Sequence, residues 1–163
     1  MTNNSVLRSL RFMLNANNAK MVEICKLGDT FVSEEEMQVF MKEEEDKDHE
    51  ACPDEVLAGF LNGLIISKRG KDPNRPPPPL ELPMSNNQVL KKLRVAFELK
   101  EEDMLQIIGA NGFEFTKAEL SALVRARDHR NYRVAQDQVL RNFLKGLTSR
   151  VHEKTEKTPA AKA

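Results

Sequence analysis

The sequence contains one stretch twice, and this internal repeat constrains the fold more than any other feature. When the chain is aligned with itself at an offset of 83 positions, NNSVLRSLR from Asn3 lies over NNQVLKKLR from Asn86. The alignment continues without a gap to Leu64 over Leu147, and sixteen of its 62 pairs are identical. Chance would give about four. We interpret the chain as two copies of one unit.

Apolar residues recur at helical spacing in four segments of each copy, so each copy is expected to hold four helices. The third segment opens with a capping box in both copies, Ser33-x-x-Glu36 and Thr116-x-x-Glu119. The fourth segment is expected to begin near Pro53-Asp54. The expected fold class is all-α, with two homologous four-helix units that share a core about a pseudo-two-fold axis. Two separate units are the alternative, although a unit of this size is marginal alone.

The expected boundaries follow from composition. The first helical repeat is assigned to residues 3–71 and the second to residues 85–151, with a proline-rich linker at 72–84. Four consecutive prolines, Pro76 to Pro79, make this linker an extended spacer. The tail at residues 152–163 lacks apolar periodicity and is expected to be disordered.

These segments also carry a family resemblance. The stretches NNSVLRSLRFML, DEVLAGFLNGLIISKRGK, VLKKLRVAF, ELSALVR and HRNYRVAQDQVLRNFLKGL resemble the YehS-like family, bacterial proteins with two tandem copies of a domain of unknown function. The resemblance covers about Asn3 to Arg150. It implies a cytoplasmic protein with two repeats, and it supplies no activity, substrate or functional residue.

The overall composition argues against membrane insertion and secretion. The longest apolar run, Leu64 to Ile66, is far too short for a membrane span, and Arg8 and Arg11 interrupt the apolar N-terminal stretch. The two cysteines, Cys25 and Cys52, form no CxxC pair. They align with Ile108 and Ala135 of the second copy, so they are expected to be buried and inert. A cytoplasmic location is expected.

No motif indicates an enzyme, a cofactor or a metal site. His49, His129 and His152 form no paired-histidine motif, and the run Glu43 to Glu50 lacks the spacing and the turn glycine of a calcium loop. The sequence has neither a Walker A motif, nor a GxGxxG motif, nor a nucleophile elbow. A non-enzymatic protein without a cofactor is expected.

Charge divides the two copies although the whole chain is neutral, with 25 basic and 25 acidic residues. Residues 1–71 hold 9 basic and 13 acidic residues, net −4, and residues 85–152 hold 12 and 8, net +4. Most of the contrast lies in one equivalent segment. Lys42 to Glu50 has a net charge of −4, whereas its twin, Arg125 to Arg133, has a net charge of +3. The two segments are expected to lie apart on outer surfaces.

This asymmetry suggests two functions. The first is a non-catalytic interaction protein that binds another macromolecule or a second copy of itself through its charged faces, a protein partner being favoured over nucleic acid. The alternative is a DNA- or RNA-binding regulator that uses a helix-turn-helix-like segment of the second repeat. The candidate contact residues for either function are Arg125, Arg127, His129, Arg130, Tyr132 and Arg133.

Two structural expectations follow from polar residues and glycines that both copies share. Arg11 is expected to pair with Asp54, and Arg94 with Asp137, because an unpaired charge on an apolar helix is costly. Gly63 and Gly146 interrupt the fourth helical segment, where glycine costs about 1 kcal/mol relative to alanine. Each glycine is therefore expected to face a neighbouring helix at close range, the twin helix across the pseudo-two-fold axis being one candidate.

Overall fold

The computed structural model describes residues 1–157 apart from residues 75, 77, 78 and 111. Every regular element in this part of the chain is a helix, which confirms the expected all-α class. The first repeat contains α1 (Asn3–Leu14), α2 (Asn18–Leu27), α3 (Glu34–Phe40) and α4 (Asp54–Arg69). The second contains α5 (Asn86–Ala96), α6 (Glu101–Ile108), α7 (Lys117–Val124) and α8 (Asp137–Lys157).

The helices repeat at the offset found in the sequence. The helices of the second repeat begin at residues 86, 101, 117 and 137, each 83 positions after its counterpart at 3, 18, 34 or 54. Both expected capping boxes are formed, by Ser33 with Glu36 and by Thr116 with Glu119. Pro53 is the N-cap of α4, so the first helical residue is Asp54 rather than the proline. Sequence duplication and helix placement therefore agree.

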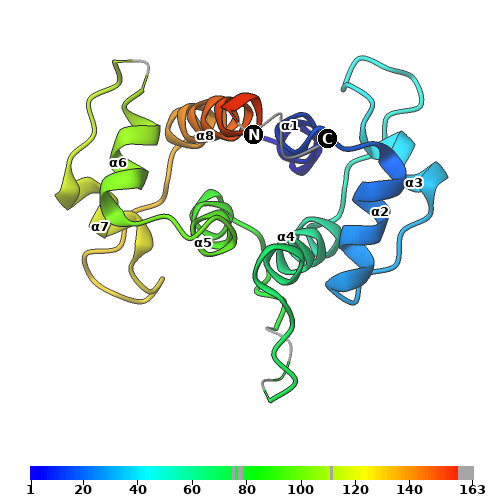
Figure 1. The fold of residues 1–163 in the computed structure, drawn as a ribbon, viewed down its shortest axis with the longest axis horizontal. Coiled ribbons are helices and arrows are strands. Elements are labelled where there is room, and N and C mark those ends of the chain that lie inside the picture. The colour runs from blue at the N-terminus through cyan, green and yellow to red at the C-terminus, as the bar shows by residue number, and fades with distance from the viewer. Residues whose placement is uncertain (75, 77–78, 111, 158–163) are drawn as a thin grey trace.

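Four helices form the centre of the molecule, and two pairs of short helices flank it. Figure 1 shows α1, α4, α5 and α8 nearly end-on in the middle, with α2 and α3 on one side and α6 and α7 on the other. Helix α1 packs against α8, and α4 packs against α5, so each repeat places its first helix on the fourth helix of the other. The repeats therefore share one core rather than forming separate units. Its fully buried side chains include Leu7, Leu10, Phe60, Leu64, Leu90, Leu93, Phe143 and Leu147.

Backbone contacts at the helix starts are exchanged between the repeats in the same reciprocal way. The amide of Met84, just before α5, donates to Asp54 of the first repeat at 3.0 Å. The backbone nitrogen of Met1, the equivalent residue before α1, donates to Asp137 of the second repeat. The reciprocity is what a two-fold relation between the repeats would produce.

We call the contact of α1 with α8 the α1–α8 seam and that of α4 with α5 the α4–α5 seam. Hydrogen bonds at equivalent positions also join the two helices at the far end of each seam. Arg69 of α4 donates to the carbonyl of Val95 on α5 at 3.2 Å. His152 of α8 lies with Nε2 at 3.1 Å from the carbonyl of Phe12 on α1, at equivalent positions. Each seam between the repeats is thus fixed at both of its ends.

The shared glycines lie where helices come closest, as expected. A Cβ on Gly63 would lie 1.8 Å from the carbonyl oxygen of Ile24 in α2, and a Cβ on Gly146 would lie 2.2 Å from that of Ile107 in α6. The neighbour is the second helix of the same repeat rather than the twin of the fourth helix. Only glycine permits this backbone-to-backbone approach.

The expected ion pairs of Arg11 with Asp54 and of Arg94 with Asp137 are wrong. Arg11 donates instead to the side-chain oxygen of Asn18 at 2.8 Å, and Arg94 donates to a backbone carbonyl just before α6 at 3.2 Å. Both arginines lie in the last turn of their helix, whereas the aspartates meet its first residue. Eight residues of helix, about 12 Å, separate the two ends.

The segments outside the repeats agree only in part with expectation. The described residues of the linker at 72–84 contain no helix, and all of them except Met84 are exposed. The tail, expected to be disordered from residue 152, instead continues α8 to Lys157, because Val151 packs against the core and His152 contacts Phe12. Residues 158–163 of the expected tail lie outside the described residues.

We expect Gly63→Ala and Gly146→Ala each to lower the free energy of unfolding by at least about 2 kcal/mol, because the new methyl group meets a backbone carbonyl that cannot move alone. Urea unfolding followed by circular dichroism measures the loss. Ser67→Ala, at an exposed position on α4, is the control and should change little. A stability gain in both glycine variants would contradict the close approach.

Candidate functional site

The loop before the fourth helix is held in both repeats by a buried asparagine. Asn4 is 2% exposed; its side-chain amide donates to the carbonyls of Phe40 (3.0 Å) and Glu50 (2.8 Å) and accepts from the amide of Cys52 (2.9 Å). Asn87 makes the same three bonds in the second repeat, at 2.9, 2.8 and 2.9 Å, with Leu123, Arg133 and Ala135. One side chain thus closes each loop at its base.

A basic side chain on the first helix holds the start of each loop. Arg8 donates to the carbonyl of Lys42 at 2.9 Å, and its counterpart Lys91 donates to the carbonyl of Arg125 at 3.1 Å. The backbone entry and exit are therefore tied in both copies. The side chains between the start and the end of each loop make none of these backbone contacts, and in this part of the loop the two copies carry opposite charge.

We call residues 125–133 the arginine loop. Arg127 and Arg130 are exposed and form no hydrogen bond or ion pair with the part of the chain that the structure describes. Arg133 is exposed, and its guanidinium donates to the carbonyl of Tyr132 at 3.1 Å. Arg125 is half-buried and donates to Ser121 at 3.3 Å. Three of the four expected arginines are therefore available to a partner.

The other two expected contact residues are less available. Tyr132 is half-buried, which limits the ring face that a base or side chain could stack on. His129 is exposed, but its Nδ1 lies 3.0 Å from the amide of Asn131 within the loop. The structure thus brings the predicted residues together on one loop, with its accessible charge concentrated in the arginines.

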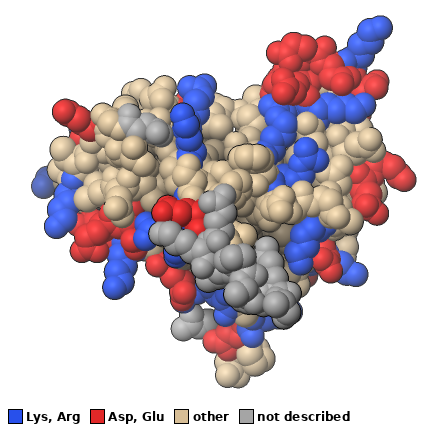
Figure 2. Space-filling model, turned by 45° about the horizontal axis from the view of Figure 1, so that its top comes forward, with Lys and Arg blue, Asp and Glu red and all other residues tan. Residues whose placement is uncertain are grey.

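Residues 42–50, which we call the acidic loop, lie on the opposite side of the molecule from the arginine loop (Figure 1). Acidic side chains gather at this corner in Figure 2. The carboxylate of Glu44 lies 3.5 Å from the guanidinium of Arg8. A backbone hydrogen bond lowers the pKa of the Glu44 carboxyl most, and a hydrogen bond from the Thr2 hydroxyl lowers it further. Lys42 pairs with Asp48 at 3.2 Å. The two loops are separate charged surfaces, as expected.

An apolar groove, not expected from the sequence, borders the arginine loop. This α7 groove has a volume of about 630 Å³, and the stacked rings of Phe113 and Phe115, 6.3 Å apart, line it together with Ala122, Arg133 and Val134. Val134 is 70% exposed. Arg133 belongs to both the loop and the groove, so one continuous surface offers positive charge beside apolar side chains.

The helix-turn-helix-like segment of the second repeat offers little basic surface. Helix α7 buries Leu120 and Leu123, and its single basic side chain, Lys117, lies 3.3 Å from Glu101. Glu119 serves the capping box of the helix. A recognition helix normally presents unpaired polar side chains to base edges, and α7 has few to offer.

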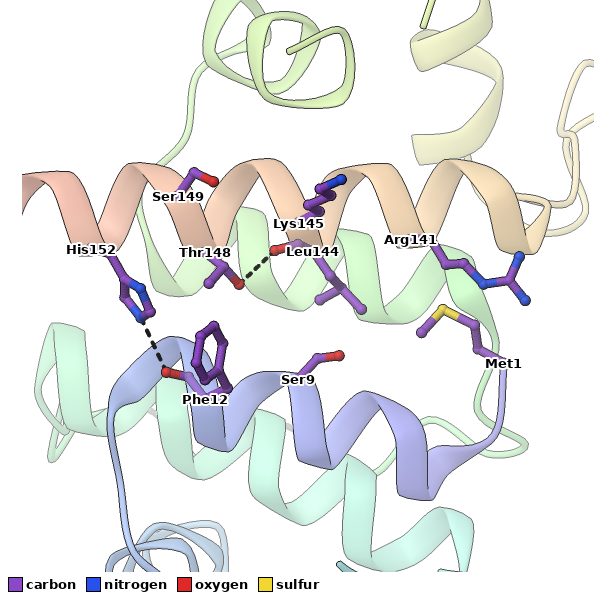
Figure 3. Close-up of a pocket in the computed structure, with 9 residues that line it drawn as sticks. All are labelled: Met1, Ser9, Phe12, Arg141, Leu144, Lys145, Thr148, Ser149 and His152. Carbon is purple, nitrogen blue, oxygen red and sulfur yellow. Dashed lines mark hydrogen bonds between the residues drawn. The ribbon is translucent and has the colours of Figure 1, made fainter. Parts of the chain in front are cut away.

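A second groove that the sequence reading missed lies between α1 and α8 (Figure 3). This α1–α8 groove has a volume of about 350 Å³. Ser9 and Phe12 line it from α1, and Arg141, Lys145 and His152 line it from α8. The sequence does hold a signal for it, since Arg141 and Lys145 are one helical turn apart and replace Ala58 and Asn62 of the first copy.

The cysteines are buried, as their apolar counterparts in the second copy indicated. Cys25 and Cys52 are 0% and 5% exposed, and both are free thiols. Burial raises the pKa of each thiol to about 12. A thiol with so high a pKa is a poor nucleophile at neutral pH.

Two kinds of feature are absent from the residues that the structure describes. None of the helices there combines the length and the apolar character that a bilayer-spanning helix needs. Within the same residues, no three histidine, cysteine, aspartate or glutamate side chains gather in a group suited to a metal ion.

These features define a class: a tandem helical-repeat protein whose copies share one backbone plan and differ in surface charge. The family model described as "Protein of unknown function (DUF1456)" matches residues 3–70 and 86–152, and the chain belongs to this family. It is 46% identical over 154 residues to "Uncharacterized protein YehS" of Escherichia coli (strain K12), a match that covers 94% of this chain and 99% of the relative. No solved structure matches the chain significantly.

We expect Asn87→Ala to destabilise the protein by about 3 kcal/mol, because it leaves two carbonyls and one amide at a buried site without partners. Asn4→Ala should have a similar effect in the first repeat. Thermal and urea unfolding measure both losses, with the exposed Asn131→Ala as control. Losses below about 0.5 kcal/mol in both variants would contradict the anchoring role.

We expect neither cysteine of the native protein to react with a thiol reagent such as 5,5′-dithiobis(2-nitrobenzoate) at pH 8, because thiolate is scarce when the pKa is about 12. Absorbance should rise only after denaturant is added, when both thiols become accessible. Rapid reaction of one equivalent in the folded protein would show an exposed thiolate instead.

Proposed function

We propose that this protein is a non-catalytic interaction protein whose second repeat binds an acidic, partly apolar segment of another protein. The surface that carries this function consists of the arginine loop and the adjoining α7 groove. The observation on which the proposal depends is that Arg133 and Val134 follow each other in the chain and join the two features.

The charges of the surface select the partner. Arg127, Arg130 and Arg133 present guanidinium groups that are exposed and not engaged by acidic residues among the described part of the chain. Guanidinium groups bind carboxylates through paired hydrogen bonds. The partner segment should therefore carry aspartate or glutamate opposite the loop.

The apolar groove favours a protein over nucleic acid. Phe113, Phe115 and Val134 offer a place for leucine- or phenylalanine-sized side chains, which a nucleic acid backbone does not have. Interfaces between proteins commonly combine such an apolar centre with a charged rim. The half-buried Tyr132 and the paired Lys117 provide less for DNA or RNA than the nucleic-acid hypothesis requires.

The acidic loop makes a second copy of the chain a specific candidate for the partner. It lies on the opposite side of the molecule from the arginine loop (Figure 1), so the two loops cannot neutralise each other within one copy. Between copies they would meet head to tail. A separate acidic protein remains the principal proposal, because the α7 groove requires apolar side chains that the sequence of the acidic loop, KEEEDKDHE, lacks.

The test compares Arg127→Ala/Arg130→Ala with the wild type. The ligands are a labelled glutamate-rich peptide that contains leucines and a labelled single-stranded DNA of similar length. We expect the double variant to bind the peptide at least about tenfold more weakly, since charge-assisted contacts contribute about 1 kcal/mol or more each. Its melting temperature should be unchanged, because both side chains are exposed. Fluorescence anisotropy at low and physiological salt measures binding.

Arg141→Ala/Lys145→Asn is the matched control, because it removes the same amount of positive charge away from the loop. It should bind the peptide within about twofold of the wild type. Tighter binding of the DNA, lost in the arginine-loop variant, would replace the proposal with the nucleic-acid alternative. Sedimentation that shows self-association, abolished by the same variant, would make a second copy the partner. A large loss of stability without any loss of binding would show that the loop serves the fold.

A further inference from the structure

The seams between the repeats are equivalent in sequence but differ in chemistry. In the α4–α5 seam, Ala58 and Asn62 of α4 are buried, at 4% and 3% exposure. The equivalent residues of α8 are Arg141 and Lys145, which are exposed on the edge of the α1–α8 groove. Lys92 of α5 stands where α1 has the short Ser9. One seam is thus filled with small or half-buried side chains, and the other is open and cationic.

The cations of the open seam face no carboxylate among the lining residues, although Arg141 interacts electrostatically with Asp137 on the preceding turn of α8. None of the residues that line the α1–α8 groove is acidic. Arg141 and Lys145 form no hydrogen bond or close ion pair with any residue that the structure describes. Asp137, one turn before Arg141, accepts hydrogen bonds from Met1 and Asn86, which lower its pKa, and the charge of Arg141 lowers it further. Two positive charges on one groove edge favour a dianion.

The groove also has an apolar end. Phe12 is 66% exposed, and the ring of His152 meets it edge-on at 5.0 Å. Figure 3 places Phe12 and His152 at one end, Arg141 and Met1 at the other, and Ser9 and Lys145 between them. A ligand lying along the groove would therefore meet an aromatic ring, then hydroxyl and ammonium groups, then a guanidinium.

We propose that the α1–α8 groove binds a small phosphate monoester that carries a flat ring, the class to which mononucleotides belong. Arg141 and Lys145 hold the phosphate, with the hydroxyls of Ser9 and Ser149 as further donors. The ring packs on Phe12 beside His152. The cavity of about 350 Å³ falls at the small end of the range for ligand sites, about 300–1,000 Å³, which suits a ligand of this size.

The test titrates the full chain with AMP, inorganic phosphate and adenosine by calorimetry. Arg141→Ala/Lys145→Asn gives α8 the residues of its twin helix and should weaken AMP binding at least about tenfold. Phe12→Ala should weaken AMP binding while leaving inorganic phosphate unchanged. Arg127→Ala/Arg130→Ala removes the same charge elsewhere and should bind AMP like the wild type. Circular dichroism verifies that each variant is folded.

Three outcomes would overturn the proposal: no binding of AMP at millimolar concentration, binding of adenosine as tight as that of AMP, or equal weakening by the groove and arginine-loop variants. The first would show that the groove binds no ligand of this class. The second would show that the cations are not used, and the third would show only a general effect of net charge. None of these results decides whether the arginine loop binds an acidic peptide, because that assay uses the peptide as ligand.

Discussion

The packing of each repeat's first helix against the fourth helix of the other repeat is the contact on which the whole structure depends. A single unit of this size buries too little apolar surface to be stable alone. The exchange joins α1 to α8 and α4 to α5 around one core. It also places the two charged loops on opposite sides of the molecule and creates the two seams between the repeats. Both proposed binding surfaces follow from this arrangement.

Two asparagines and two glycines that the copies share contact backbone, whereas the loop side chains that give the copies opposite charge are mostly exposed. Asn4 and Asn87 close equivalent loops, and Gly63 and Gly146 allow equivalent close approaches. Such roles depend on geometry that few other residues provide. A charged side chain on an exposed loop has no such constraint, so the copies diverged there. Because the two copies share these backbone contacts and differ in their loop side chains, one fold presents an acidic loop and an arginine loop.

Comparison of the copies predicted more than either copy would have done alone. The repeat located the starts of the third and fourth helices, the buried cysteines and the glycine contacts, because equivalent positions share an environment. The comparison predicted the wrong partners for Arg11 and Arg94. A charged residue that occurs at the same position of both copies has a structural role, but its position does not show which end of the helix its partner contacts. The α7 groove was missed because the Phe113 and Phe115 pair has no counterpart pattern in the first copy.

The sequence by itself determined the all-α class, the two repeats, the capping boxes and the opposite charges of the equivalent loops, because helical periodicity and local capping are properties of neighbouring residues. The tertiary structure alone decided which helices pack across the repeats, that α8 continues past residue 151 and that Arg141 and Lys145 border an open groove. Those features depend on contacts between residues that are distant in the sequence, 26 positions apart for Arg69 with Val95 and 140 for His152 with Phe12. No local pattern specifies such contacts; the burial of apolar surface between the repeats does.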